Sequence, residues 1–209
     1  YAAQFWASLE AEAFVSKDIY HLIEIGLDLI PKNCQIYKLV SQIYNWSKNI
    51  GDWHEVRELI NQNYGYDKYK GNCHIIPNHA IMIMSLLYSK NDFSKAISIA
   101  CTSGWDTDCN AGNIGCLLGI MGGLEGINSG PDWRGPIADK MIISSADGGN
   151  SINDAVKMSY YIANIGKKLS GEKPFSKPKN GKQFHFSLPG STQGFKISSS
   201  KKTTSKATI

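Results

Sequence analysis

Two aspartates, Asp106 and Asp108, are the residues whose types and spacing best suit chemistry. They lie between a glycine turn and an apolar, glycine-rich stretch, in the segment Ser103-Gly104-Trp105-Asp106-Thr107-Asp108-Cys109-Asn110. A loop at the start of a helix lets both carboxylates point at one position, whereas the helix interior does not at this spacing. Convergent carboxylates are typical ligands of a hard cation such as Mg²⁺. Both aspartates are therefore candidate metal ligands.

Helix capping is the simpler interpretation of the same two acids. Asp, Thr and Asn satisfy the free N–H groups at a helix start, and an acid there gains about 0.3–1 kcal/mol from the helix dipole. Spacing alone favours capping over metal binding. Burial would favour a cation, because two close buried carboxylates repel each other and are costly to desolvate unless they are paired.

The residues after the acids predict a buried helix. Small residues recur every four positions and share one helix face: Ala111, Gly115, Gly119 and Gly123. Each glycine costs about 1 kcal/mol of helix propensity relative to alanine, and close approach of a neighbouring backbone would offset that cost. Three polar residues interrupt the window that a membrane span would need: Asn110, Asn113 and Glu125. We therefore expect no membrane association, and a central helix whose start lies inside the fold.

Histidines and aromatic residues supply further candidates. His74 and His79 flank a proline, and either could act as a general base or bind substrate, although a structural role at a loop-to-helix junction is more common. Their spacing is not a helical pair and no cysteines stand at finger spacing, which disfavours zinc. A tyrosine cluster could stack a ring but more often packs: Tyr64, Tyr66 and Tyr69. Two further segments could line the rim of a pocket, but their residues are equally typical of turns: Asp132-Trp133-Arg134 and Asp147-Gly148-Gly149.

Periodic apolar positions predict an all-α domain over residues 1–170. About seven helices are expected, and no strand pattern interrupts them. Three aspartates stand where helix N-caps are expected: Asp18, Asp52 and Asp92. Residues 80–88 are almost entirely apolar and predict a buried helix. A last helix is expected from a capping-box-like start at Ser151 and Asp154 to about residue 169.

The chain changes character after residue 171. Apolar residues alternate on both sides of Pro189-Gly190, which predicts a β-hairpin-like extension over residues 181–198 or the start of a truncated β module. Residues 199–209 are polar and expected to be a disordered tail. Residues 171–209 carry eight Lys against one Glu, whereas residues 1–170 carry 14 basic and 17 acidic groups. The helical region therefore has no basic stripe of the kind that binds nucleic acid.

The cysteine count suggests a compartment. Five cysteines, an odd number with no C-x-x-C pair, are expected to be reduced thiols in an intracellular, cytoplasmic protein. The chain starts at Tyr1 and has helical character from the outset, so we expect an internal piece of a longer protein, and the absence of a signal peptide carries no information. A monomer is expected.

Several segments together are similar to a known family. They include Ile76-Pro77-Asn78, Asn91-Asp92-Phe93, Ala96-Ile97, Gly104-Trp105-Asp106-Thr107-Asp108, and the helix with Gly115 and Gly119. Ala11-Glu12-Ala13-Phe14 and Leu27-Asp28-Leu29-Ile30-Pro31 extend the likeness upstream. On these residues the chain resembles the C-terminal half of the ADP-ribosylglycohydrolase family, the dinitrogenase-reductase-activating and ADP-ribosyl-acceptor hydrolase group. The likeness covers about residues 1–170.

The resemblance implies an orthogonal multi-helix bundle with a two-ion magnesium site, in which Mn²⁺ is an alternative. It implies hydrolysis of an N- or O-glycosidic bond between ADP-ribose and a protein side chain or small acceptor. Asp106 and Asp108 fall on family metal ligands, and Cys109 stands where the family usually has a Thr ligand. Because a thiol is a poor Mg²⁺ ligand, coordination by Cys109 is in doubt. The candidate substrate contacts are Ser103, Gly104, Trp105 and His74, and His74 is also the one candidate catalytic residue.

A departure from the family pattern leaves three hypotheses open. The family's N-terminal half supplies a Gly-rich entry helix and a Thr-Asp-Asp-Thr segment that completes the metal shell, and neither occurs in this sequence. We therefore expect about half a site, with poor or no activity from this fragment alone. The alternatives to a hydrolase are a degenerate domain that binds ADP-ribose or a nucleotide without cleaving it, and a structural helical domain whose acids are caps.

Overall fold

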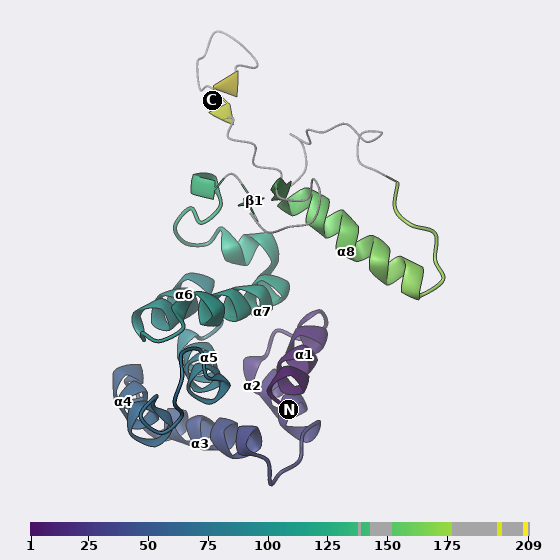
Figure 1. The fold of residues 1–209 in the computed structure, drawn as a ribbon. Coiled ribbons are helices and arrows are strands. Elements are labelled where there is room, and N and C mark those ends of the chain that lie inside the picture. The colour runs from purple at the N-terminus through teal and green to yellow at the C-terminus, as the bar shows by residue number, and fades with distance from the viewer. Residues whose placement is uncertain (138, 143–151, 177–195, 198–206, 209) are drawn as a thin grey trace. The chain divides into compact units, whose positions relative to one another are not determined.

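The computed structural model describes residues 1–137, 139–142, 152–176, 196–197 and 207–208, and the statements below concern those residues. They form two compact units, residues 1–131 and 132–209. Seven α-helices make up the first unit (Figure 1): α1 (Ala2–Ala13), α2 (Ile19–Asp28), α3 (Gln35–Asn49), α4 (Trp53–Tyr64), α5 (Ile75–Ser89), α6 (Phe93–Thr102) and α7 (Thr107–Ile127). The expected all-α class is confirmed.

The predicted aspartate caps explain where three of these helices begin. Asp18 accepts a hydrogen bond from the N–H of Tyr20 at 2.9 Å. Asp52 and Asp92 likewise accept from N–H groups of the first turns of α4 and α6, at 3.0 and 2.8 Å. Each carboxylate satisfies a donor that the helix itself leaves free. The sequence-based starts of α2, α4 and α6 are therefore confirmed.

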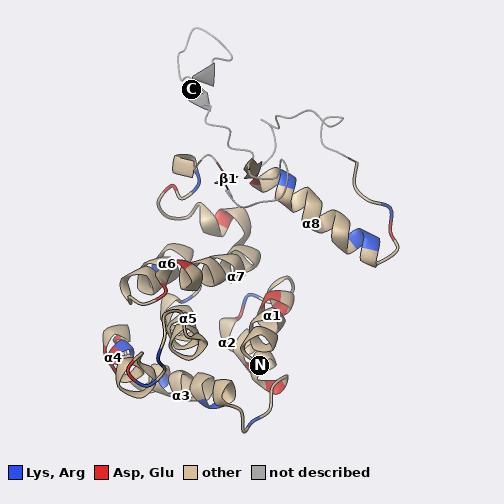
Figure 2. Cartoon of the chain, viewed as in Figure 1, with Lys and Arg blue, Asp and Glu red and all other residues tan. Residues whose placement is uncertain are grey.

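Helix α5 is the core of the first unit. Thirteen of its 15 residues are buried, and it contacts α2, α3, α4, α6 and α7. It contains no charged residue, as its uniform tan colour in Figure 2 shows, whereas blue and red residues are interspersed on the surrounding helices. Burying an all-round apolar helix removes the most apolar area from water and so stabilises the unit. The prediction of a buried helix over residues 80–88 is confirmed.

The prediction that the glycine-stepped helix is central was wrong. Helix α7 buries one face, through Asn110, Ile114, Leu117, Leu118 and Met121, and leaves its start accessible. A Cβ at Gly115 would lie 3.4 Å from the Ile97 side chain, and one at Gly119 would lie 3.6 Å from Ile127, so no neighbouring backbone approaches these positions. Gly123 instead has a positive φ of 59° and kinks the helix.

The close approach that glycine permits occurs elsewhere, at Gly26 between α1 and α2. A Cβ there would lie 2.5 Å from Leu9 and 2.7 Å from Phe5, both fully buried. We expect Gly26→Ala to lower the free energy of unfolding by about 2 kcal/mol, because the core must shift to accommodate the methyl group. Gly112→Ala is the matched control, since no atom lies within 4 Å of a Cβ at that position. The higher helix propensity of alanine should raise its free energy of unfolding by at most about 1 kcal/mol. Urea unfolding of both variants measures this, and equal midpoints would contradict it.

The second unit contains a hairpin that the sequence patterns did not reveal. A short 3₁₀ helix, η1 (Gly135–Ile137), precedes β1 (Lys140–Ile142), which pairs antiparallel with β2 (Ile152–Asp154), and α8 (Ala155–Leu169) follows. Three-residue strands give too short an alternation to detect in sequence. Asp154 is itself the N-cap of α8 and accepts from the Lys157 N–H at 2.9 Å, so the helix begins about three residues later than the predicted capping-box-like start at Ser151 and Asp154. Ser151 lies outside the described residues.

Several tail predictions fall wholly or partly on residues that the structure does not describe. The expected turn at Pro189-Gly190, most of the 181–198 extension and the Asp147-Gly148-Gly149 segment lie outside the described residues. Within the tail, β3 (Lys196–Ile197) pairs antiparallel with β4 (Ala207–Thr208). The domain boundary at residue 170 and the disorder of residues 199–209 remain predictions. No described helix combines the length and apolar character needed to cross a membrane.

Candidate metal centre

The loop between α6 and α7 holds the acid motif in a left-handed turn. Gly104 and Trp105 have positive φ angles of 77° and 66°. Arg57 of α4 fixes this turn from outside: its Nε donates to the Ser103 carbonyl at 2.8 Å, and its guanidinium lies 3.9 Å from the centre of the Trp105 ring. Tyr66 stacks on the same tryptophan with ring centres 5.0 Å apart. The turn preceding Asp106 is thus positioned by side chains from elsewhere in the unit.

Asp106 stands at the N-cap position of α7 but does not cap the helix. Its side chain accepts no hydrogen bond from a helix N–H and instead accepts from Asn78 Nδ2 at 2.8 Å. The Tyr66 hydroxyl donates to Asn78 Oδ1 at 2.8 Å, which orients that amide. The capping interpretation is therefore wrong for this side chain. A carboxylate held by an amide, rather than by its own helix, remains available to a ligand.

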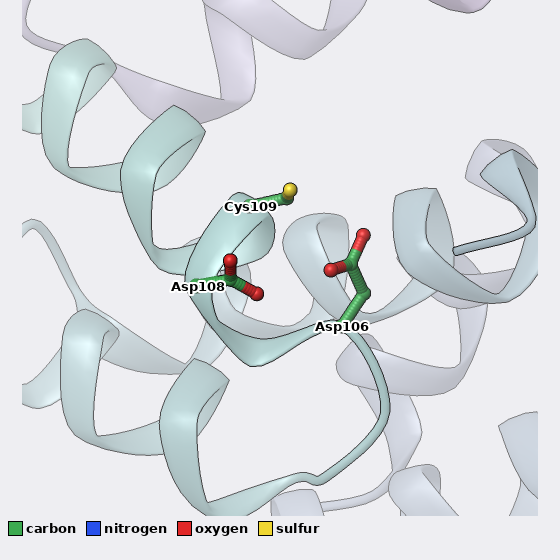
Figure 3. Close-up of side chains that lie close together, drawn as sticks. All are labelled: Asp106, Asp108 and Cys109. Carbon is green, nitrogen blue, oxygen red and sulfur yellow. The ribbon is translucent and has the colours of Figure 1, made fainter. Parts of the chain in front are cut away.

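Three candidate ligands come together at the start of α7. One carboxylate oxygen each from Asp106 and Asp108 and the Cys109 sulfur all lie within 4.8 Å of one another. Figure 3 shows Asp106 on the loop and the other two on the first helical turn, with the Asp108 carboxylate directed toward Asp106. Asp106 is half-buried, whereas Asp108 and Cys109 are exposed. The expectation of a buried acid pair was therefore wrong, because the site is open to solvent.

The pKa values of two thiols show that the field at this cluster is negative. A hydrogen bond to Asp106, then the charges of Asp106 and Asp108, raise the pKa of Cys109. Desolvation, followed by the charge of Asp106, raises the pKa of Cys73. A negative field disfavours thiolates and favours a bound cation. Cys73 was missed by sequence reasoning, because no spacing rule links the loop before α5 to the start of α7.

The other sequence-based candidates have structural roles. His74 is the N-cap of α5, where its Nδ1 accepts from the Ile76 N–H at 3.2 Å. The buried Ser103 hydroxyl, just after the end of α6, donates to the carbonyl of Ile99 in that helix at 2.6 Å. His79 is buried beneath Phe5 and Trp6, and burial lowers its pKa to about 4. A buried neutral histidine cannot reach a substrate in solvent, so His79 is excluded as a general base.

Aromatic packing and turn chemistry account for the remaining candidate segments. Tyr64 donates its hydroxyl to Gln42 and stacks on Tyr69, which supports the packing interpretation of the tyrosine cluster. Asp132 accepts from the N–H groups of Arg134 and Gly135, at 3.2 and 2.7 Å. The Asp132 segment is therefore a side-chain-stabilised turn.

A hollow beside Trp105 was not predicted from sequence. It has a volume of about 520 Å³ and is lined by Asn61, Gln62, Tyr66, Asp67, Lys68 and Trp105. That volume lies within the range of small-ligand sites, and its walls combine two aromatic rings with several polar groups. The hollow and the acid cluster are connected through Trp105, which directly precedes Asp106.

Replacing Arg57 tests how firmly the turn is held. Arg57→Ala removes the hydrogen bond to Ser103 and the contact with the Trp105 ring, and we expect a loss of about 1–2 kcal/mol in the free energy of unfolding. Arg57→Lys should recover only part of it, because an ammonium lacks the planar fork. Guanidinium unfolding followed by circular dichroism measures the loss. A wild-type midpoint for Arg57→Ala would show that the turn does not depend on this residue.

Comparison with known proteins indicates a family. A protein-family model described as ADP-ribosylglycohydrolase matches residues 1–163, most of the chain. No curated protein and no solved structure matches the sequence.

Proposed function

This chain belongs to the ADP-ribosylglycohydrolase family, and we propose that it contributes to a divalent-metal-dependent hydrolase of the bond between ADP-ribose and an acceptor. The observation that supports this most is the grouping of Asp106, Asp108 and Cys109 at one helix start. The donor set fits a divalent ion, because two carboxylates bring two negative charges and water can complete the shell. We propose Mg²⁺ or Mn²⁺ as the ion for the hydrolytic role.

In this proposal each residue of the cluster has a distinct task. The Asn78 amide donates a hydrogen bond to the Asp106 carboxylate and so holds that side chain in place. Asp108 adds the second charge from the first turn of α7, where the helix dipole favours an acid. When bound, the metal would polarise a water and hold substrate oxygens. The fixed turn before Asp106 would keep both carboxylates in place without rearrangement.

The substrate class follows from the family. An ADP-ribose unit joined through nitrogen or oxygen to a protein side chain or small acceptor is the proposed substrate. The decisive assay measures release of free ADP-ribose, with guanidinium-linked and hydroxyl-linked ADP-ribosylated proteins as substrates, in Mg²⁺, in Mn²⁺ and in chelator. Turnover that needs the metal and is lost in Asp108→Asn is expected. Turnover unaffected by chelator would overturn the metal role.

A non-hydrolytic role is the second candidate, and Cys109 is the observation that favours it. A neutral thiol beside two carboxylates is a weak Mg²⁺ ligand, so the site as built could bind ADP-ribose without activating water. Calorimetric titration with ADP-ribose, with and without Mg²⁺, separates the two. Binding without turnover in the assay above would favour the binding role, whereas turnover would exclude it.

A further inference from the structure

Asp106 is held by a side chain that is itself held by another. Asn78, in the first turn of α5, donates from its Nδ2 to Asp106 Oδ2 at 2.8 Å. Tyr66, in the loop before α5, donates from its hydroxyl to Asn78 Oδ1 at 2.8 Å. We propose that Tyr66 is a positioning residue for Asp106, and that it sets the metal affinity of this carboxylate through the Asn78 amide. The inference rests on the proposed function in requiring that Asp106 binds a divalent ion.

Asn78 is the rigid member of this hydrogen-bonded chain. Only 5% of it is exposed, and it belongs to the helix with the most buried residues of the first unit. The thiols of Cys73 and Cys109 also interact with Asp106, but both cysteines are exposed. A side chain in a close-packed interior has few alternative positions, whereas an exposed thiol can rotate into solvent. The buried amide, and not the thiols, therefore determines where the Asp106 carboxylate lies.

The Tyr66 hydroxyl favours the amide orientation that Asp106 needs. An asparagine amide presents two donors on its nitrogen and an acceptor on its oxygen. In the observed orientation both ends of the Asn78 amide are hydrogen-bonded, whereas a flipped amide would place Oδ1 against the carboxylate, acceptor to acceptor. Desolvation is the main cause that raises the pKa of Tyr66, and the charge of Asp106 adds to it, so the hydroxyl stays protonated and can donate. Without that hydroxyl the amide would lose the partner that restrains its oxygen.

The Tyr66 ring has a second contact with the same turn, which a variant can leave intact. It stacks on Trp105 with ring centres 5.0 Å apart and planes 26° apart, and Trp105 directly precedes Asp106. Arg57 lies over the same indole at 3.9 Å. Tyr66→Phe keeps the aromatic ring for this stack and removes only the hydroxyl. The variant therefore separates the hydrogen bond to Asn78 from the packing of the turn.

Mn²⁺ titration of the 209-residue chain tests the assignment. We expect Tyr66→Phe to weaken Mn²⁺ binding about 3–10-fold, the range set by one neutral hydrogen bond. Asn78→Leu, which has a similar volume but no hydrogen-bonding group, should weaken it about 10–100-fold, as loss of an outer-shell partner does. Tyr64→Phe is the matched control, because it removes a tyrosine hydroxyl that donates to Gln42, away from Asp106. It should lower the urea midpoint about as much as Tyr66→Phe but leave Mn²⁺ affinity within about twofold.

A double-mutant cycle shows whether Tyr66 acts through Asn78. In the Asn78→Leu background the hydroxyl has no amide to orient, so adding Tyr66→Phe should change Mn²⁺ affinity by less than about twofold. An equal loss from Tyr66→Phe in both backgrounds would overturn the proposal, because the tyrosine would then act by another route. The comparison of Tyr66→Phe with Tyr64→Phe decides the proposal even if Asn78→Leu is too unstable to assay.

The metal-free chain provides a measurement that does not depend on the ion. In NMR spectra the side-chain amide signals of Asn78 should shift and exchange faster with water in Tyr66→Phe, but not in Tyr64→Phe. Unchanged signals in Tyr66→Phe would overturn the proposal. If the wild-type chain binds Mn²⁺ and Tyr66→Phe binds it as tightly, the proposed function stands and this inference fails. If the wild-type chain binds no divalent ion, both fail.

Discussion

Replacing Asp106 and Asp108 together with asparagine is expected to reduce Mn²⁺ affinity by at least about 100-fold. The reason is electrostatic, since two carboxylates at the start of α7 supply the fixed charge of the cluster, and an amide oxygen carries none. Loss of an outer-shell partner alone typically costs 10–100-fold in metal affinity, so removing two direct ligands should cost more. Isothermal titration with Mn²⁺ measures the change.

The same double variant should fold normally. Asp106 caps nothing, so replacing it removes no helix-start hydrogen bond, and relief of repulsion between the two carboxylates offsets part of any other loss. Thermal midpoints should stay within a few degrees of wild type. Asp92→Asn, at a true N-cap on α6, is the matched control and should leave Mn²⁺ affinity within about twofold. If the double variant kept the wild-type Mn²⁺ affinity, Asp106 and Asp108 would not be metal ligands, and the acid motif would have only a structural role.

The sequence features that predicted the fold correctly were those that directly affect a helix, through the free N–H groups at its start or the apolar surface around it. Asp18, Asp52 and Asp92 each satisfy a free N–H, and the helices begin where these residues predict. The apolar run of α5 predicted burial because no face of it could be exposed without cost. The glycine spacing of α7 misled, since small residues permit close packing but do not require it, and packing partners are set by the tertiary fold.

The sequence named the residues of the candidate site, which remain a prediction, but it could not describe their surroundings. The spacing of the acids and the family resemblance both indicated Asp106 and Asp108. Sequence could not show that Asp106 is held by Asn78, that Tyr66 orients this amide, or that Cys73 shares the same negative field. Asn78 and Asp106 are 28 positions apart, and Tyr66 and Asn78 are 12 apart, so the tertiary fold and not any local sequence pattern brings them together.

His79 predicts a marked pH dependence of stability. Burial lowers its pKa from 6.5 to about 4 in the folded state. Its Nε2 is buried without a hydrogen-bond partner among the described residues, so protonation would leave an unpaired buried charge. Between pH 6.5 and 4 the unfolded chain holds the proton and the folded chain does not. The free energy of unfolding therefore falls as pH drops through this window, by about 3 kcal/mol in total.

Replacing the histidine isolates its contribution to this dependence. His79→Leu removes the titrating group while filling the space beside Phe5 and Trp6 with an apolar side chain. Urea unfolding at intervals from pH 7.5 to 4 should show the wild-type chain losing stability more steeply than the variant, with the gap growing below pH 6.5 and levelling near pH 4. Gly112→Ala, which changes no titrating group, should leave the wild-type slope unchanged. Parallel curves for the wild-type chain and His79→Leu would mean that His79 accepts its proton as readily folded as unfolded, and would rule out a neutral buried imidazole.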